Sequence, residues 1–170
     1  MLKYPNKAFK FELDKKSQEY KDIKDKTQTG TIVGVLRIQH ANFYLRYTKE
    51  KERLCLKLGA GNIREIYGYH GTREVHPDQI LSSPEGFDVK YARSGGMYNA
   101  GLYFAMQSRY SLNGYSFRNQ DRTRTLFYCQ FMLGKEFDSN IWRRDRDKYQ
   151  DHVYKMQRLD NRQSEAYQKT

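Results

Sequence analysis

The sequence predicts a single domain of the α+β class, and three observations support this prediction. Short apolar, β-branched or aromatic runs that are typical of strands occur at 9–13, 31–39, 66–70 and 125–133. Segments of helical composition lie among them, at 17–26, 43–58, 74–81 and 106–111. The length of 170 residues suits one domain with its own core, so residues 1–170 are expected to form a single unit.

Residues 1–30 are polar and rich in lysine, and we expect them to lead into this domain rather than to form another. The residues from Phe9 to Leu13 alternate between apolar and polar, which indicates a short strand. The residues from Ser17 to Lys26 have helical composition, and the following Thr-Gln-Thr-Gly predicts a loop.

The next unit is predicted to be a buried strand at 31–39 followed by a helix. Asn42 is a candidate N-cap for this helix, and Gly59 is well placed to end it. The charged run at 49–53 is interpreted as its solvated face. Six residues are expected to form the buried side: Phe43, Tyr44, Tyr47, Leu54, Leu56 and Leu58.

Two later segments have simple structural interpretations. His76-Pro77-Asp78 is typical of a helix entry, with His76 exposed, and we prefer this to a catalytic role. The nearly continuous apolar run at 125–133 predicts a strand covered on both faces, which Gly134 ends.

The formal net charge is +11, from 31 basic and 20 acidic side chains. Such a surface attracts polyanions: nucleic acid, a dinucleotide pyrophosphate or an acidic protein. Because the charges are scattered along the sequence, a soluble and self-repelling surface explains them equally well.

The two cysteines, Cys55 and Cys129, have no close partner in the sequence, so neither a disulfide framework nor a zinc site is expected. Free thiols are consistent with a reducing compartment, the cytoplasm or the nucleus. The first ten residues have no apolar targeting segment, and no run approaches the length of a membrane span. We therefore expect a soluble intracellular protein.

The candidate functional residues lie between Tyr69 and Tyr115. His70 follows an aromatic strand segment, so we expect it at a strand end, and Gly71 leaves its peptide open to close approach by a planar ligand. Tyr103, in a second aromatic run, could face the same cleft. Imidazole, phenol and hydroxyl groups around a bare peptide suit a flat heteroaromatic amide attached to a sugar. They suit a metal ion poorly.

These residues resemble a known family, the catalytic domains of the poly(ADP-ribose) polymerases, which are diphtheria-toxin-like ADP-ribosyltransferases. The resemblance covers about residues 8–137, whereas residues 138–170 diverge. It rests on His70-Gly71-Thr72, on the Gly-Leu-Tyr-Phe-Ala segment at 101–105, and on Ser111 and Tyr115. It also rests on a strand-to-helix segment at 36–47, which begins Leu-Arg-Ile-Gln, and on Gly86-Phe87-Asp88.

The resemblance implies a fold of antiparallel strands around an NAD cleft with peripheral helices. NAD would be the co-substrate, Gly71 and Ser111 would hold the nicotinamide carboxamide, and His70 would bond the adenosine ribose with Thr72 near the same sugar. Tyr103 and a second tyrosine would stack on the nicotinamide ring. The family places that tyrosine three residues after its serine, whereas Tyr115 lies four after Ser111. Tyr115 is preferred for this role and Tyr110 is the alternative.

Two departures from the family pattern concern activity. Asn99-Ala100 replaces the usual glycine-lysine pair before Tyr103, and the late strand that carries the third active-site residue is not recognisable. Glu165 is the best candidate for that residue, and the alternative is a solvated glutamate near the terminus.

We therefore expect an enzyme that transfers a single ADP-ribose from NAD to a protein side chain. Two alternatives stay open. One is a catalytically silent module that binds NAD, ADP-ribose or a protein, and the other is a nucleic-acid binder or an NAD-dependent transferase acting on nucleic acid.

Overall fold

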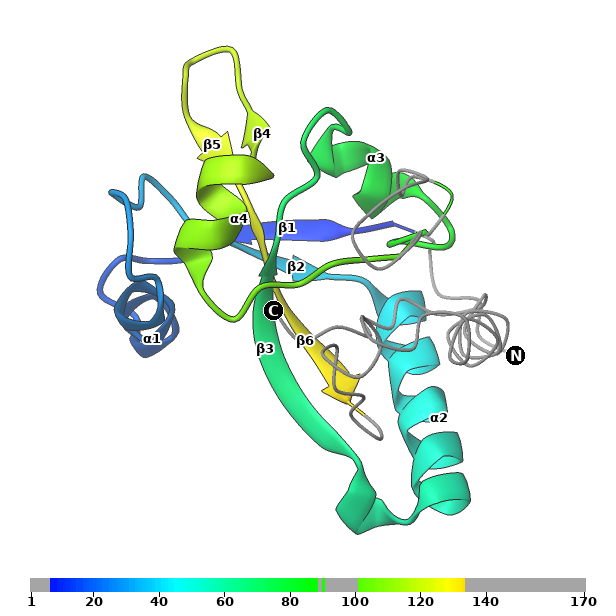
Figure 1. Ribbon diagram of the computed structural model, residues 1–170. Coiled ribbons are helices and arrows are strands. Elements are labelled where there is room, and N and C mark those ends of the chain that lie inside the picture. The colour runs from blue at the N-terminus through cyan, green and yellow to red at the C-terminus, as the bar shows by residue number, and fades with distance from the viewer. Residues whose placement is uncertain (1–6, 89, 91–100, 134–170) are drawn as a thin grey trace, which may run out of the picture.

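The computed structural model of the protein describes residues 7–88, 90 and 101–133 (Figure 1). Within these residues, helices are combined with three antiparallel strand pairs, which confirms the predicted α+β class. The strands are β1 (Phe9–Glu12), β2 (Leu36–Gln39), β3 (Arg64–His70), β4 (Phe117–Arg118), β5 (Arg124–Thr125) and β6 (Phe127–Leu133). The helices are α1 (Gln18–Lys26), α2 (Ala41–Leu58), the 3₁₀ turn η1 (Ala60–Asn62), α3 (Pro77–Ser82) and α4 (Ser108–Gly114).

The longest strand pair, β3 with β6, runs through the centre of the view in Figure 1. Its antiparallel register extends from Arg64 opposite Leu133 to His70 opposite Phe127. On its other edge β3 exchanges two backbone hydrogen bonds of 2.8 Å with Ala105, through the N–H and C=O of Tyr69. The segment that carries Tyr103 is thereby held beside the last residues of β3.

One aromatic cluster of the core lies on one face of this pair. Phe104 and Phe131 are buried against each other, with ring centroids 4.8 Å apart, and half-buried Ile66 and Leu102 pack around them. Gly68 makes this packing possible, because a Cβ on that residue would lie 2.9 Å from the Phe131 ring. The predicted strand is present as β6. Phe131 and Met132 point to opposite faces and are both buried, so cover on both faces is confirmed at this end of the strand, whereas Gln130 is exposed.

The predicted strand at 31–39 is wrong in length and in burial. Only Leu36–Gln39 is a strand, and the side chains of Val33 and Leu36 are 67% and 54% exposed. The reason is that its partner β1 is short: pairing ends where the Leu13 N–H donates to Val35 O at 2.9 Å, and the chain then turns into α1.

Helix α2 begins two residues earlier than predicted, because its N-cap is His40 and not Asn42. His40 Nδ1 accepts from the Phe43 N–H at 3.4 Å, and the two rings stack with centroids 3.7 Å apart. The C-terminus at Gly59 is confirmed, where φ is +86°.

The buried face of α2 also differs from the prediction. Leu54 is buried, whereas Leu56 and Tyr44 are 89% and 68% exposed. Residues two apart lie on nearly opposite sides of a helix, so Leu54 and Leu56 cannot both face the core. Glu50, predicted to be solvated, is buried and forms an ion pair with Arg53.

Helix α3 begins at Pro77, and His76 is its exposed N-cap, as predicted. The His76 side chain accepts a hydrogen bond from the Asp78 N–H at 3.1 Å. After α3 the chain passes Gly86, whose φ is +72°, and places Phe87 beside the end of β3.

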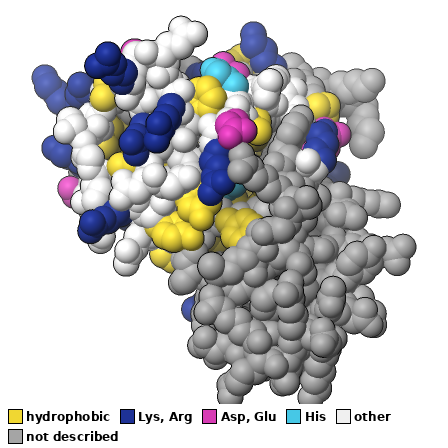
Figure 2. All heavy atoms as spheres, turned by 45° about the horizontal axis from the view of Figure 1, so that its top comes forward, with side chains coloured by type: hydrophobic (Ala, Val, Ile, Leu, Met, Phe, Trp, Pro, Cys, Tyr) yellow, Lys and Arg dark blue, Asp and Glu magenta, His cyan; other side chains and the backbone are white. Residues whose placement is uncertain are grey.

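Figure 2 shows Lys and Arg side chains distributed over the visible face of the described residues rather than gathered in one block. The prediction from the sequence that the charge is scattered agrees with this view. No helix among the described residues is both long and apolar enough to cross a membrane.

Gly86→Ala is expected to destabilise the fold by about 2 kcal/mol, because the new Cβ would meet the Phe43 ring at 2.9 Å in a backbone conformation that favours glycine. Urea unfolding measures the effect. Gly61→Ala is the matched control, since no atom lies within 4 Å of a Cβ at that position. Equal unfolding midpoints for the two variants would contradict the described packing.

Candidate active site

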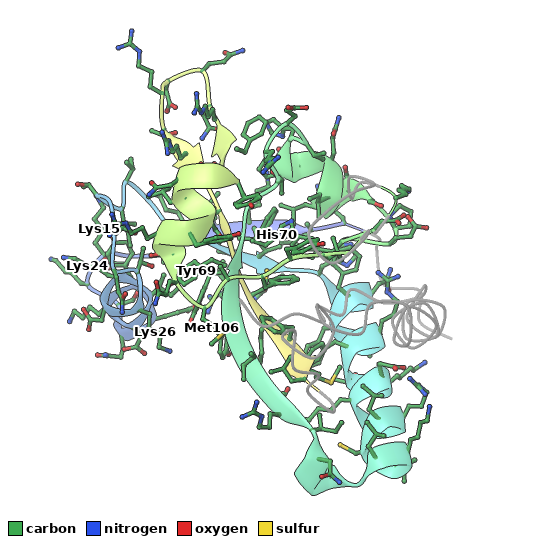
Figure 3. The ribbon with its side chains drawn as sticks, in the orientation of Figure 1. Lys15, Lys24, Lys26, Tyr69, His70 and Met106 are labelled. Carbon is green, nitrogen blue, oxygen red and sulfur yellow. The ribbon has the colours of Figure 1, made fainter. Side chains whose placement is uncertain are left out.

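His70 is the last residue of β3, as its position in the sequence predicts, and Figure 3 shows it beside Tyr69 at the end of that strand. Its Nδ1 lies 2.7 Å from the backbone oxygen of Tyr103. The imidazole is enclosed by the rings of Phe87 and Phe104, whose centroids are 5.0 Å and 5.1 Å away. The aromatic walls and the Tyr103 carbonyl fix both the position and the orientation of the ring.

These surroundings determine the charge and the tautomer of His70. Burial lowers the pKa of the imidazole below its ordinary value, and the hydrogen bond to Tyr103 opposes this shift only in part. The ring is therefore neutral near pH 7. A carbonyl oxygen can only accept, so Nδ1 carries the proton and Nε2 keeps a lone pair. Nε2 is thus set up to accept a hydrogen bond from a hydroxyl group.

Gly71 has a structural requirement that the sequence did not reveal. A Cβ at this position would collide with the carbonyl group of Tyr115 and lie 2.8 Å from Ser116 N. The Tyr115 backbone fills the space that a side chain would take, so the approach of a ligand to Gly71 stays a prediction. Among the described residues, neither the N–H nor the C=O of Gly71 has a hydrogen-bond partner. One donor and one acceptor therefore remain available at the end of β3.

Ser111 is 3% exposed, and its hydroxyl donates to the Tyr69 carbonyl at 2.9 Å. Helix α4 carries it, so this bond fixes α4 to the end of β3. Because the single hydroxyl proton is already used, the Ser111 oxygen can only accept from a further group in this geometry. That capacity fits the NH₂ of a carboxamide.

The two alternatives for the second stacking tyrosine lie together. The rings of Tyr110 and Tyr115 are stacked, with centroids 5.3 Å apart and an interplanar angle of 26°. Their hydroxyl oxygens are 3.2 Å apart. Tyr115 is the C-cap of α4, and its backbone lies against Gly71, so this residue is the one joined directly to the end of β3.

Comparison with known proteins bears on this arrangement. The sequence model of one protein family, the poly(ADP-ribose) polymerase catalytic domain, matches residues 10–169 of this chain. A protein described as a probable poly [ADP-ribose] polymerase of Dictyostelium discoideum is 31% identical over 138 residues, which cover 76% of this chain and 40% of the relative.

The chain belongs to the poly(ADP-ribose) polymerase catalytic domain family. The resemblance inferred from the motifs is confirmed, and the match extends past residue 137, where those motifs could no longer be followed. The family uses NAD as co-substrate and transfers its ADP-ribose. The chain spans less than half the length of the relative.

The groups found at the end of β3 fit NAD chemically. The open N–H and C=O of Gly71 can pair with the oxygen and the NH₂ of a carboxamide, and the lone pair of His70 Nε2 can accept a ribose hydroxyl. The Thr72 hydroxyl donates to Val75 O at 2.6 Å and can only accept from a sugar. Tyr103 contributes its carbonyl to His70, and its ring edge lies near Gly101.

Other chemistries find less support in the described part of the chain. Those residues contain no group of three His, Cys, Asp or Glu that could hold a metal ion. Burial raises the pKa of the Cys129 thiol to about 12, so it is protonated at neutral pH and is a poor nucleophile. Glu165 and Asn99-Ala100 lie outside the described residues.

A separate cavity of about 720 Å³ lies between β1, β2, α2 and β6. Phe87 and Phe104 line it and also contact His70, but His70 and Gly71 are not among its lining residues. The chemistry-bearing groups are therefore not in this cavity.

Sequence reasoning missed the role of Phe87 and Phe104 as walls around His70, although the sequence analysis identifies Gly86-Phe87-Asp88 as a family motif.

We predict that His70 titrates below pH 6.5, its ordinary value. Because the unfolded chain binds this proton more readily, the free energy of unfolding should fall as the pH drops below 6.5. His70→Asn should remove the part of this decrease that comes from His70. Imidazole ¹⁵N NMR measures the titration and reports the tautomer. A protonated Nε2 at pH 7 would contradict the assignment.

Proposed function

We propose that the chain transfers a single ADP-ribose unit from NAD to a protein side chain and releases nicotinamide. The observation that carries the proposal is the pairing, at one strand end, of an open Gly71 peptide with a neutral His70 whose Nε2 accepts. These two groups match the two ends of the substrate, the carboxamide and the adenosine ribose. Membership of the family supports the same chemistry.

In the proposed reaction the bond between the nicotinamide nitrogen and C1′ of its ribose breaks. Its electron pair leaves with nicotinamide, and the ribose carbon acquires oxocarbenium character. A nucleophilic side chain of the acceptor then donates a lone pair to C1′ and loses its proton. Such a reaction depends on orientation and on exclusion of water more than on a strong base.

The roles follow from the capacities of the groups. The Gly71 peptide and the Ser111 oxygen would hold the carboxamide, so that the ring cannot rotate about its bond to the sugar. His70 Nε2 would accept from the adenosine ribose, with Thr72 near that sugar. The rings of Tyr103 and Tyr115 would stack on the nicotinamide, where a neutral aromatic surface favours the planar leaving group. Glu165 is proposed as the group that activates the acceptor.

One observation favours a second candidate, a module that binds NAD or ADP-ribose without turnover. The contacts of His70 among the described residues are aromatic rings and a carbonyl, and no acidic side chain contributes to the shift of its pKa. The described part therefore supplies groups for binding but no acid or base beside His70. Whether Glu165 supplies one decides between the two candidates.

Incubation with NAD labelled in its adenosine, followed by mass spectrometry of modified protein, tests the proposal. We expect His70→Ala and Tyr103→Ala each to lower transfer and NAD cleavage by about a hundredfold, because misplaced substrate reacts far more slowly. His76→Asn is the matched control, since that residue is exposed and caps α3.

Full activity in both His70→Ala and Tyr103→Ala would refute the proposal. If the wild-type chain and Glu165→Gln bind NAD equally well and neither forms labelled product, the silent module would be favoured instead.

A further inference from the structure

Arg73 has a backbone conformation that arginine rarely adopts. Its φ is +53°, and among the described non-glycine residues only Arg122 shares a positive φ. It lies three residues after His70, in the turn between β3 and α3, and is exposed. A residue in this region of φ requires compensating contacts, and Arg73 makes two of them with the same partner.

Both contacts are with Tyr115. The Arg73 N–H donates to the Tyr115 backbone oxygen at 2.8 Å. The Arg73 guanidinium lies over the Tyr115 ring, 4.3 Å from its centroid, which is within the range of a cation–π interaction. One residue therefore holds both the main chain and the aromatic ring of Tyr115.

The remaining neighbours of Tyr115 complete this arrangement. Gly71 packs against its carbonyl group, and the Tyr110 hydroxyl lies 3.2 Å from its own hydroxyl. The backbone is thus held by Gly71 and Arg73, while the ring is in contact with a guanidinium and with a second ring. Of these, the guanidinium is the contact that comes from the turn directly after His70-Gly71-Thr72.

We propose that Arg73 is a positioning residue that orients the Tyr115 ring for the nicotinamide end of the site, an inference that rests on the proposed function. Its guanidinium lies over the Tyr115 ring, and Tyr110 is stacked against that ring, so the two contacts together restrict its rotation. The contacts of His70, which serve the ribose end, do not include Arg73. Arg73 should therefore affect recognition of nicotinamide and leave recognition of ADP-ribose unchanged.

Arg73→Gly is the informative variant. Glycine adopts the positive φ without strain and keeps the N–H that donates to Tyr115, so the substitution removes the side chain with its guanidinium and preserves the backbone contact. Arg122→Gly is the matched control, because Arg122 is an exposed arginine with φ of +67° in the turn between β4 and β5. Calorimetric titration of the full chain with nicotinamide and, separately, with ADP-ribose measures the binding affinity at each end of the site.

We expect Arg73→Gly to weaken nicotinamide binding by about two- to fivefold, the range of an exposed cation–π contact, with ADP-ribose affinity unchanged. Ring-labelled tyrosine NMR should show the Tyr115 signal shifted in this variant and unshifted in Arg122→Gly. Equal loss of both ligands would indicate a general structural effect and overturn the inference.

The outcomes also separate this inference from the proposed function. Unchanged nicotinamide affinity in Arg73→Gly, with the wild-type chain binding both ligands, would overturn the role of Arg73 alone. A wild-type chain that binds neither ligand would overturn the proposed function and this inference together, even if the NMR shift shows that Arg73 contacts Tyr115.

Discussion

The antiparallel pairing of β3 with β6 is the constraint on which the rest of the site depends. It ends with His70 opposite Phe127, so the backbone leaves the sheet at Gly71 with its peptide no longer used by the ladder. The free edge of β3 holds the segment that carries Tyr103, through Tyr69 and Ala105. Ser111 attaches α4 to the same point. Three separate segments of the chain thus converge on the last two residues of one strand.

The environment of His70 shows how the fold selects one chemical form of a side chain. Rings on two sides remove water, which disfavours the charged imidazole, and the Tyr103 carbonyl assigns the proton to Nδ1. A histidine held in this way donates from Nδ1, can accept at Nε2 in a fixed direction, and is a poor general acid at neutral pH. This property suits a reaction that requires orientation of a sugar more than acid catalysis, since the departing nicotinamide needs no proton.

The sequence was informative where local chemistry determines the structure. His70 at a strand end, His76 at a helix entry and Gly59 at a helix end all follow from short-range rules, and the structure confirms them. Predictions that depended on tertiary partners failed. Residues 31–35 look like a strand but extend beyond their short partner β1, and Leu56 is apolar yet faces away from the core. His40 replaces Asn42 as the cap because its ring also stacks on Phe43, a gain that cap preferences do not include.

The motifs indicated the candidate site, but only part of its physical basis could be predicted from the sequence. A glycine at position 71 was expected for the sake of a ligand, whereas the structure also requires it because the Tyr115 backbone leaves no room for a Cβ. Gly71 and Tyr115 are 44 positions apart, and their contact cannot be deduced from the spacing of motifs. The contact of Arg73 with the Tyr115 ring could not be deduced for the same reason. Glu165, proposed as the third active-site residue, lies outside the described residues.

The central claim is that the Gly71 peptide is an available donor and acceptor for a carboxamide. Two-dimensional NMR of the ¹⁵N-labelled chain during titration with nicotinamide tests it most directly. The account predicts a saturable downfield shift of the Gly71 amide proton, with no change at Gly61, which lies in the turn after α2. Saturable binding that perturbs other amides and leaves Gly71 unmoved would contradict it.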